Sequence, residues 1–184
     1  MSYRVVTCFN EKLLKNNGAK LLEDFASKWD TAIEFDCYYY DLDIKHYSLP
    51  KAKNIHYYNL SNLSDYTEFV ERNKEHNGTE NGEFEYNETI DALTEAPKVF
   101  AISETMFNNS LSWVLWVDPH CYTMGKVTTG YLEKVFTHDN SEVPLTLIED
   151  QTHFAAFQIT YQPCVDLIAC LLYTSDAADD LLCV

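Results

Sequence analysis

The sequence predicts an α/β domain with a mostly parallel sheet flanked by helices. A β-rich run at 3–8 is followed by an amphipathic segment and then by a second β-rich run at 33–40. Strand, helix and strand in this order begin a parallel sheet with a right-handed crossover. The third observation is the run Trp113–Val117, which is apolar throughout and too short for a helix. Such a run is typical of a parallel strand that is covered on both faces.

The segment after the first strand carries the signals of a helix with one buried face. Asn10 stands at the N-cap position, and Glu11 lies in the first turn. Large apolar residues then recur every three to four positions; they are Leu14, Leu21, Leu22, Phe25 and Trp29. Gly18 interrupts the pattern and weakens the helix by about 1 kcal/mol relative to alanine. We therefore predict a single helix that begins after Asn10.

The second strand is predicted to have two faces of different composition. Alternation places every second side chain on the same face of a strand. One face carries Ile33, Phe35, Cys37 and Tyr39, and the other carries Glu34, Asp36, Tyr38 and Tyr40. A polar loop over 41–53 and a third strand or extended piece over 55–60 are expected to follow.

The middle of the chain is predicted to hold two helices joined by a loop. Ser64 is expected at the N-cap of a helix that runs to about Glu75. The stretch 76–87 has few apolar residues and is predicted to be a flexible loop. A second helix is expected over 89–106, and Pro97 should kink or restart it, because proline lacks a backbone N–H.

Three shorter elements are predicted after the buried strand. The segment 121–127 is expected to be a loop, and Thr128 then caps a short helix that ends at Phe136. Strand patterns follow at 144–148 and 153–161. These strands complete the predicted sheet.

Composition bounds the class of protein and its partners. A chain of 184 residues suffices for one domain with a core. The net charge of −16 repels phosphate backbones, which argues against nucleic acid as a partner. A nucleotide remains possible because a metal ion can supply local positive charge. Neither a signal peptide nor an apolar run of about 18 residues is evident, so we expect no membrane segment and a cytoplasmic protein.

The spacing of the cysteines argues against a zinc site. The chain has six cysteines, none of them in a Cys-x-x-Cys pair. Apart from His120 beside Cys121, no histidine lies at ligand spacing. Reduced core or loop thiols are therefore the expectation.

Asp118 is the first candidate for a functional residue. It directly follows the buried run Trp113–Val117, and ligands of open α/β sheets bind outside the carboxyl ends of the strands. Two interpretations stay open at this point. Asp118 could hold a ligand, or it could hydrogen-bond the backbone amides of the turn, as aspartate often does.

Three segments carry a resemblance to a known family. They are Tyr3-Arg-Val-Val-Thr-Cys-Phe-Asn-Glu-Lys12, Ala96-Pro-Lys-Val-Phe-Ala-Ile102 and Trp116-Val-Asp-Pro-His120. Together they resemble glycosyltransferase-like proteins of marine phage and bacterial genomes, which have the Rossmann-like GT-A fold. In that fold an Asp-x-Asp pair holds a divalent metal against the diphosphate of a nucleotide-sugar. The resemblance implies a Mn²⁺ or Mg²⁺ cofactor, a nucleotide-sugar donor and an acceptor of unknown kind.

The chain departs from the family pattern at one metal ligand. His120 replaces the second acid of the pair, so Asp118 and His120 are the candidate metal ligands. Mg²⁺ can be held by one or two carboxylates, and an imidazole shifts the preference toward Mn²⁺ or a softer ion. An ordinary loop histidine is the alternative for His120.

Three more residues are candidates for donor contacts. Thr7 and Asn10 lie at the end of the first strand, where they could contact the base and ribose, although Asn10 could equally be a plain helix cap. The resemblance places a basic residue at Lys98 near the nucleotide phosphates, and a solvated surface lysine is the alternative.

The last fifteen residues are set apart from the domain. Cys170-Leu-Leu-Tyr-Thr-Ser-Asp-Ala-Ala-Asp-Asp180 resembles the translation of a sequencing adapter. We therefore assign 1–169 to one partial, carboxyl-terminally truncated GT-A-like domain, and exclude 170–184 from it.

These observations lead to two hypotheses for function. The first is a metal-dependent glycosyltransferase-like protein that moves a sugar from a nucleotide donor to an acceptor. The alternative is a non-catalytic binding or scaffold protein with the same fold and a degenerate Asp-x-Asp motif.

Overall fold

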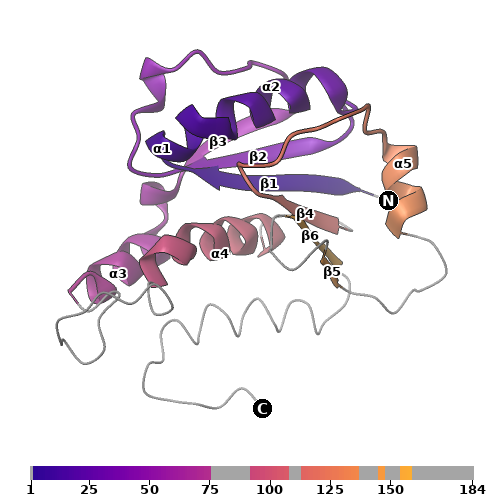
Figure 1. Ribbon diagram of the computed structural model, residues 1–184. Helices are drawn as coiled ribbons and strands as arrows, with labels where there is room; N and C mark the ends of the chain where they lie inside the picture. Colours follow the sequence, from indigo (N-terminus) through magenta and orange to yellow (C-terminus); the bar gives the residue numbers. More distant parts are fainter. Residues whose placement is uncertain (1, 76–91, 108–112, 137–144, 148–153, 159–184) are drawn as a thin grey trace.

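The computed structural model describes residues 2–75, 92–107, 113–136, 145–147 and 154–158, and in them it contains a six-stranded sheet with helices on both faces (Figure 1). The strands are β1 (Tyr3–Phe9), β2 (Glu34–Tyr39), β3 (Ile55–Asn59), β4 (Trp113–Val117), β5 (Leu145–Leu147) and β6 (Phe154–Gln158). Their order is β3-β2-β1-β4-β6-β5. The first four strands in this order are parallel, whereas β6 is antiparallel to both β4 and β5. The predicted class is confirmed.

Two helical layers cover the sheet. The helices α1 (Glu11–Leu13), α2 (Ala19–Lys28) and α5 (Thr129–Phe136) pack on one apolar cluster, and α3 (Ser64–Asn73) and α4 (Ala92–Phe107) pack on the other (Figure 1). In β1, Val5 and Phe9 belong to the first cluster, and Val6 and Cys8 belong to the second. Alternation along the strand therefore sends neighbouring side chains into different layers.

The alternation predicted for β2 is also found. Phe35 and Cys37 are buried in the cluster beneath α2, and Tyr38 is buried in the cluster beside α4. All five residues of β4 are buried, as predicted for a strand covered on both faces.

The first helix differs from the prediction in its middle. A π-helical turn, Leu14–Gly18, separates α1 from α2, although the backbone stays helical throughout. A Cβ atom at Gly18 would lie 3.1 Å from the carbonyl oxygen of Leu13, so glycine allows this close approach. The sequence pattern predicted one continuous α-helix and gave no sign of this π turn.

Two predicted helix boundaries are corrected. Ser64 is the first residue of α3 rather than its cap; Leu63 occupies the N-cap position, and the Ser64 hydroxyl donates to Asp65. The helix α4 continues through Pro97, so of the predicted kink or restart the restart is absent. The Thr128 cap is confirmed, because the Tyr131 N–H donates to Thr128 Oγ1 at 3.1 Å.

Several predictions fall outside the described residues. These are the flexible loop at 76–87, the end of the domain at 169 and the excluded segment 170–184. Among the helices that the structure describes, none has the length and apolar character required to cross a membrane.

A buried carboxylate connects α2 to the loop that follows β4. Asp24 is buried, and its oxygens lie 2.5 Å from Lys20 Nζ and 2.9 Å from Lys28 Nζ. It also accepts a hydrogen bond from the backbone N–H of Thr123 at 3.0 Å. Hydrogen bonds lower the pKa of Asp24 to about 2. The one from Lys20 has the largest effect, and those from Lys28 and Thr123 have smaller effects. This carboxylate holds the loop after β4 against α2.

Asp24→Asn should therefore destabilise the protein by roughly 2 kcal/mol near neutral pH, because two charge-assisted hydrogen bonds are lost. Because the pKa of Asp24 is lower in the folded state, its charged form stabilises the fold at pH values above the unfolded pKa of about 3.9. This stabilisation is lost as the pH falls toward the folded pKa. Urea unfolding of parent and variant should thus show a difference that shrinks between neutral pH and about pH 3. Glu23→Gln, an exposed neighbour, is the control. A difference that does not change with pH would contradict this role of Asp24.

Candidate functional site

The carboxyl ends of β1, β2 and β4 meet at one edge of the sheet. Parallel strands end on the same side, so Asn10, Asp41 and Asp118 all emerge at this edge. The helix α4 runs along the adjacent face of the sheet (Figure 1) and contributes Glu95 and Lys98. We call this region the carboxyl edge. It is where open α/β sheets bind ligands.

Asp118 and His120 lie together in the turn after β4. Asp118 Oδ1 accepts the backbone N–H of His120 at 2.9 Å and lies 2.7 Å from its Nδ1 atom. The carboxylate is 21% exposed and the imidazole 50% exposed. The backbone hydrogen bond that the sequence left open as the simpler role of Asp118 is therefore present. The structure also brings both candidate metal ligands into direct contact.

Asp118 and His120 supply one oxygen and one nitrogen that could bind a metal ion. The 2.7 Å between Asp118 Oδ1 and His120 Nδ1 is a hydrogen-bond distance, so a shared ion would have to replace this contact. The described residues contain no group of three or more acids, histidines and cysteines placed to hold a metal. The pair could thus provide two ligands, and phosphate oxygens and water would have to complete the shell.

Lys98 lies over the end of β4. Its Nζ atom is 5.4 Å from the centre of the Trp116 ring and 4.0 Å from Glu95 Oε2. Burial raises the pKa of the Cys8 thiol, Asp118 raises it further, and Lys98 opposes both. Lys98 and Asp118 are therefore close enough to one buried thiol for both to act on it. The structure brings this predicted lysine to the same edge as the predicted metal ligands.

Thr7 and Asn10 have different environments from each other. Thr7 is fully buried on the α2 side of β1, and its hydroxyl has no hydrogen-bond partner within the described part of the chain. Asn10 is the N-cap of α1, and its Oδ1 atom accepts the Leu13 N–H at 2.9 Å. The cap that was one alternative for Asn10 is present. Contacts of either residue with a nucleotide stay a prediction.

The prediction from sequence missed two residues at this edge. Asp41 follows β2 and has a positive φ of 50°. The pKa of the neighbouring Tyr40 is raised by burial first, and then by nearby groups that include Asp41 and Glu95. Applying the strand-end rule to the second strand would have found Asp41. Glu95 had no signal in the sequence, since only the packing of α4 brings it here. The edge therefore carries three acids, Asp41, Glu95 and Asp118, together with Lys98.

Comparison with known proteins identifies the fold. No family model and no curated protein matches the sequence. Among solved structures, mouse xyloside xylosyltransferase 1 in its apo form matches with a TM-score of 0.56 at 8% identity, over 94% of this chain and 72% of that chain. The apo form of the glycosyltransferase GlyE of Streptococcus pneumoniae TIGR4 matches with a TM-score of 0.55 at 10% identity, over 99% of this chain. The match spans 40% of GlyE. The chain has a glycosyltransferase-like α/β fold.

The cap formed by Asn10 gives a direct test of its structural role. Asn10→Ala should lower the free energy of unfolding by about 1 kcal/mol, because the Leu13 N–H loses its acceptor. Asn10→Asp should preserve stability, since its carboxylate can accept the same hydrogen bond next to the helix N-terminus. Chemical denaturation measures both. Parent-like stability of Asn10→Ala would show that the cap is not needed.

Proposed function

We propose that this chain binds a nucleotide-sugar at the carboxyl edge with Mn²⁺ or Mg²⁺ and transfers the sugar to an acceptor. The observation that carries the proposal is the contact between Asp118 and His120 at the end of β4. The glycosyltransferase-like fold supports it, because its solved neighbours are glycosyltransferases by name.

The charge of the carboxyl edge explains why a metal would be required. Asp41, Glu95 and Asp118 are acidic, and Lys98 is close to Glu95. A diphosphate brought to this edge meets repulsion from the carboxylates, which Lys98 offsets only in part. A divalent cation supplies the missing positive charge and acts as a Lewis acid on the leaving diphosphate.

The protein's own residues would then have separate roles. Asp118 is held by the His120 backbone N–H, which orients its carboxylate at the end of a buried strand. His120 would provide a nitrogen ligand beside it, and Lys98 would contact the phosphates. The Trp116 ring beneath Lys98 restricts where the ammonium group can lie.

A second function follows from the same contact. Asp118 Oδ1 already accepts from both the backbone and the ring of His120. If this pairing persists when a nucleotide is present, the edge provides no strong metal site, and the chain is a binding or scaffold protein without transfer activity. Metal dependence of binding distinguishes the two functions.

Titration with UDP- and GDP-sugars, with and without Mn²⁺, tests the metal ligands. We expect parent binding to require Mn²⁺ and Asp118→Asn to lose this metal-dependent binding. Asparagine can still accept the His120 N–H, so this variant should keep the turn. His120→Ala should weaken metal-dependent binding less, and His120→Asp should shift preference toward Mg²⁺, because carboxylate oxygen is the harder ligand.

The outcomes of that titration separate the hypotheses. Metal-independent binding by the parent favours the non-catalytic protein. Absence of binding with any metal, together with no gain from His120→Asp, would refute the transferase proposal.

The role of Lys98 can be tested with a matched lysine. Lys98→Ala should weaken nucleotide-sugar binding about tenfold or more, since a charge-assisted contact to phosphate is lost. Lys53→Ala is the control, because Lys53 is exposed and precedes β3 at the opposite edge. Calorimetry with a nucleotide-sugar and with the nucleoside alone measures the effect. Equal weakening of both ligands would contradict a phosphate contact.

A further inference from the structure

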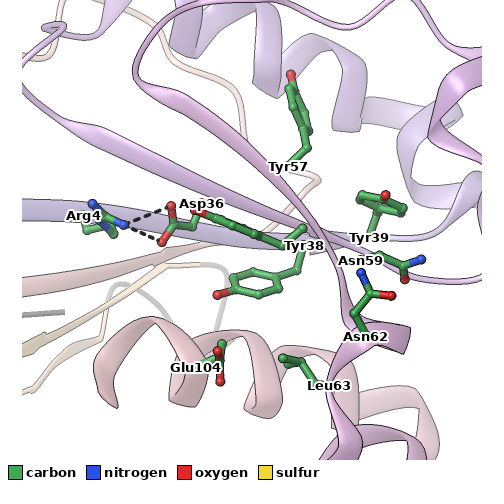
Figure 2. Close-up of a pocket in the computed structure, with 10 residues that line it drawn as sticks. Arg4, Asp36, Tyr38, Tyr39, Tyr57, Asn59, Asn62, Leu63 and Glu104 are labelled. Carbon is green, nitrogen blue, oxygen red and sulfur yellow. Dashed lines mark hydrogen bonds and ion pairs between the residues drawn. The ribbon is translucent and has the colours of Figure 1, made fainter. Parts of the chain in front are cut away.

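A polar pocket of about 420 Å³ lies on the α4 side of the sheet. Figure 2 shows it between the strands and α4, with Arg4 and Asp36 at one end and Asn59 and Asn62 at the other. Glu104 of α4 also lines the pocket (Figure 2). We call it the Arg4–Asp36 pocket. Its volume falls within the roughly 300–1,000 Å³ of small-molecule sites.

An ion pair between a partly exposed arginine and a buried aspartate forms one end of this pocket. Arg4 Nη1 donates to the two carboxylate oxygens of Asp36 at 3.0 and 3.3 Å. The Asp36 side chain is 2% exposed, and burial raises its pKa although Arg4 opposes the change. Arg4 Nε is also buried and has no partner among the described residues. The Nε atom is therefore covered, and Arg4 can reach a ligand only through the part of its guanidinium that stays exposed beside Asp36.

Aromatic rings and amides form the rest of the wall. The rings of Tyr38 and Tyr58 lie 5.2 Å apart, and Tyr58 is 41% exposed. Asn59 and Asn62 add amide groups, each with both a donor and an acceptor. Apolar ring faces thus stand beside hydrogen-bonding groups of both kinds.

The charges in the pocket select against an ionic ligand. An anion would be repelled by Asp36 and Glu104. Burial raises the pKa of Glu104, and the nearby carboxylate of Asp65 raises it further. A cation that fills the pocket would be attracted by Glu104 but would also lie against the guanidinium of Arg4, which is paired with Asp36. A neutral molecule with many hydroxyl groups avoids both penalties. Its hydroxyls can donate to the carboxylates and accept from Arg4, while its C–H face covers a tyrosine ring.

We propose that the Arg4–Asp36 pocket binds a neutral sugar ring, without metal or nucleotide. A second pocket of about 150 Å³ shares Leu63 and Glu104 with it and continues past Phe100 between α3 and α4. A ligand longer than one ring would extend toward this second pocket. This binding is separate from donor binding at the carboxyl edge and does not depend on transfer activity.

Binding of glucose, galactose, xylose and lactose at millimolar concentrations, followed by NMR without nucleotide or metal, tests the proposal. At least one of these sugars should bind the parent. Tyr58→Ala and Glu104→Gln should each weaken its binding about tenfold. Both side chains are partly exposed, so these variants should fold. Asp36→Ala is avoided because it would leave the largely covered Arg4 without its partner. Tyr131→Ala, an exposed tyrosine on α5, should leave binding unchanged.

A separate probe tests each alternative class of ligand. Glucose 6-phosphate tests for an anion site and putrescine for a cation site, and tighter binding of either than of all neutral sugars overturns the proposal. No binding of any neutral sugar, or equal effects of Tyr58→Ala and Tyr131→Ala, also overturns it. Asp118→Asn should bind neutral sugars like the parent. This variant therefore distinguishes loss of sugar binding in the Arg4–Asp36 pocket from loss of nucleotide-sugar binding at the carboxyl edge.

Discussion

The burial of β4 on both faces is the constraint on which the other features depend. Its five apolar side chains lie between β1 and β6 and between two helical layers. Leu115 belongs to the cluster under α2, and Trp116 belongs to the cluster beside α4. Each such side chain contributes about 1.5–3 kcal/mol when removed from water. A strand held this firmly fixes the point where Asp118 leaves the sheet.

The loop after β4 is held from two directions. Asp118 organises its start through the His120 N–H, and Asp24 binds the Thr123 N–H farther along. The Trp29 Nε1–H also donates to Thr123 Oγ1 at 2.9 Å. The turn that carries both candidate metal ligands is therefore anchored to the strand on one side and to α2 on the other. Such support from packed elements is what keeps ligand groups at a fixed spacing.

The helix α4 links the two proposed binding regions. Lys98 lies at the carboxyl edge, and Glu104 lines the Arg4–Asp36 pocket. Six residues of α-helix span about 9 Å, so the two regions are neighbours on one rigid element. The acidic composition acts differently in the two places. At the carboxyl edge the acids leave a need for a cation, whereas in the pocket Arg4 balances Asp36 and a neutral ligand is favoured.

The sequence by itself determined the fold class, the strand positions and the buried character of β4, because these follow from periodicity and apolar runs within short segments. It also located Asp118, His120 and Lys98, but could not show that the first two are in contact or that Lys98 lies over Trp116. The π turn at Leu14–Gly18 and the continuous helix through Pro97 were decided by packing, which overrides local propensity. The Arg4–Asp36 pair joins residues 32 positions apart on neighbouring strands. Only the register of the sheet brings these two charges together, and no local pattern encodes that register.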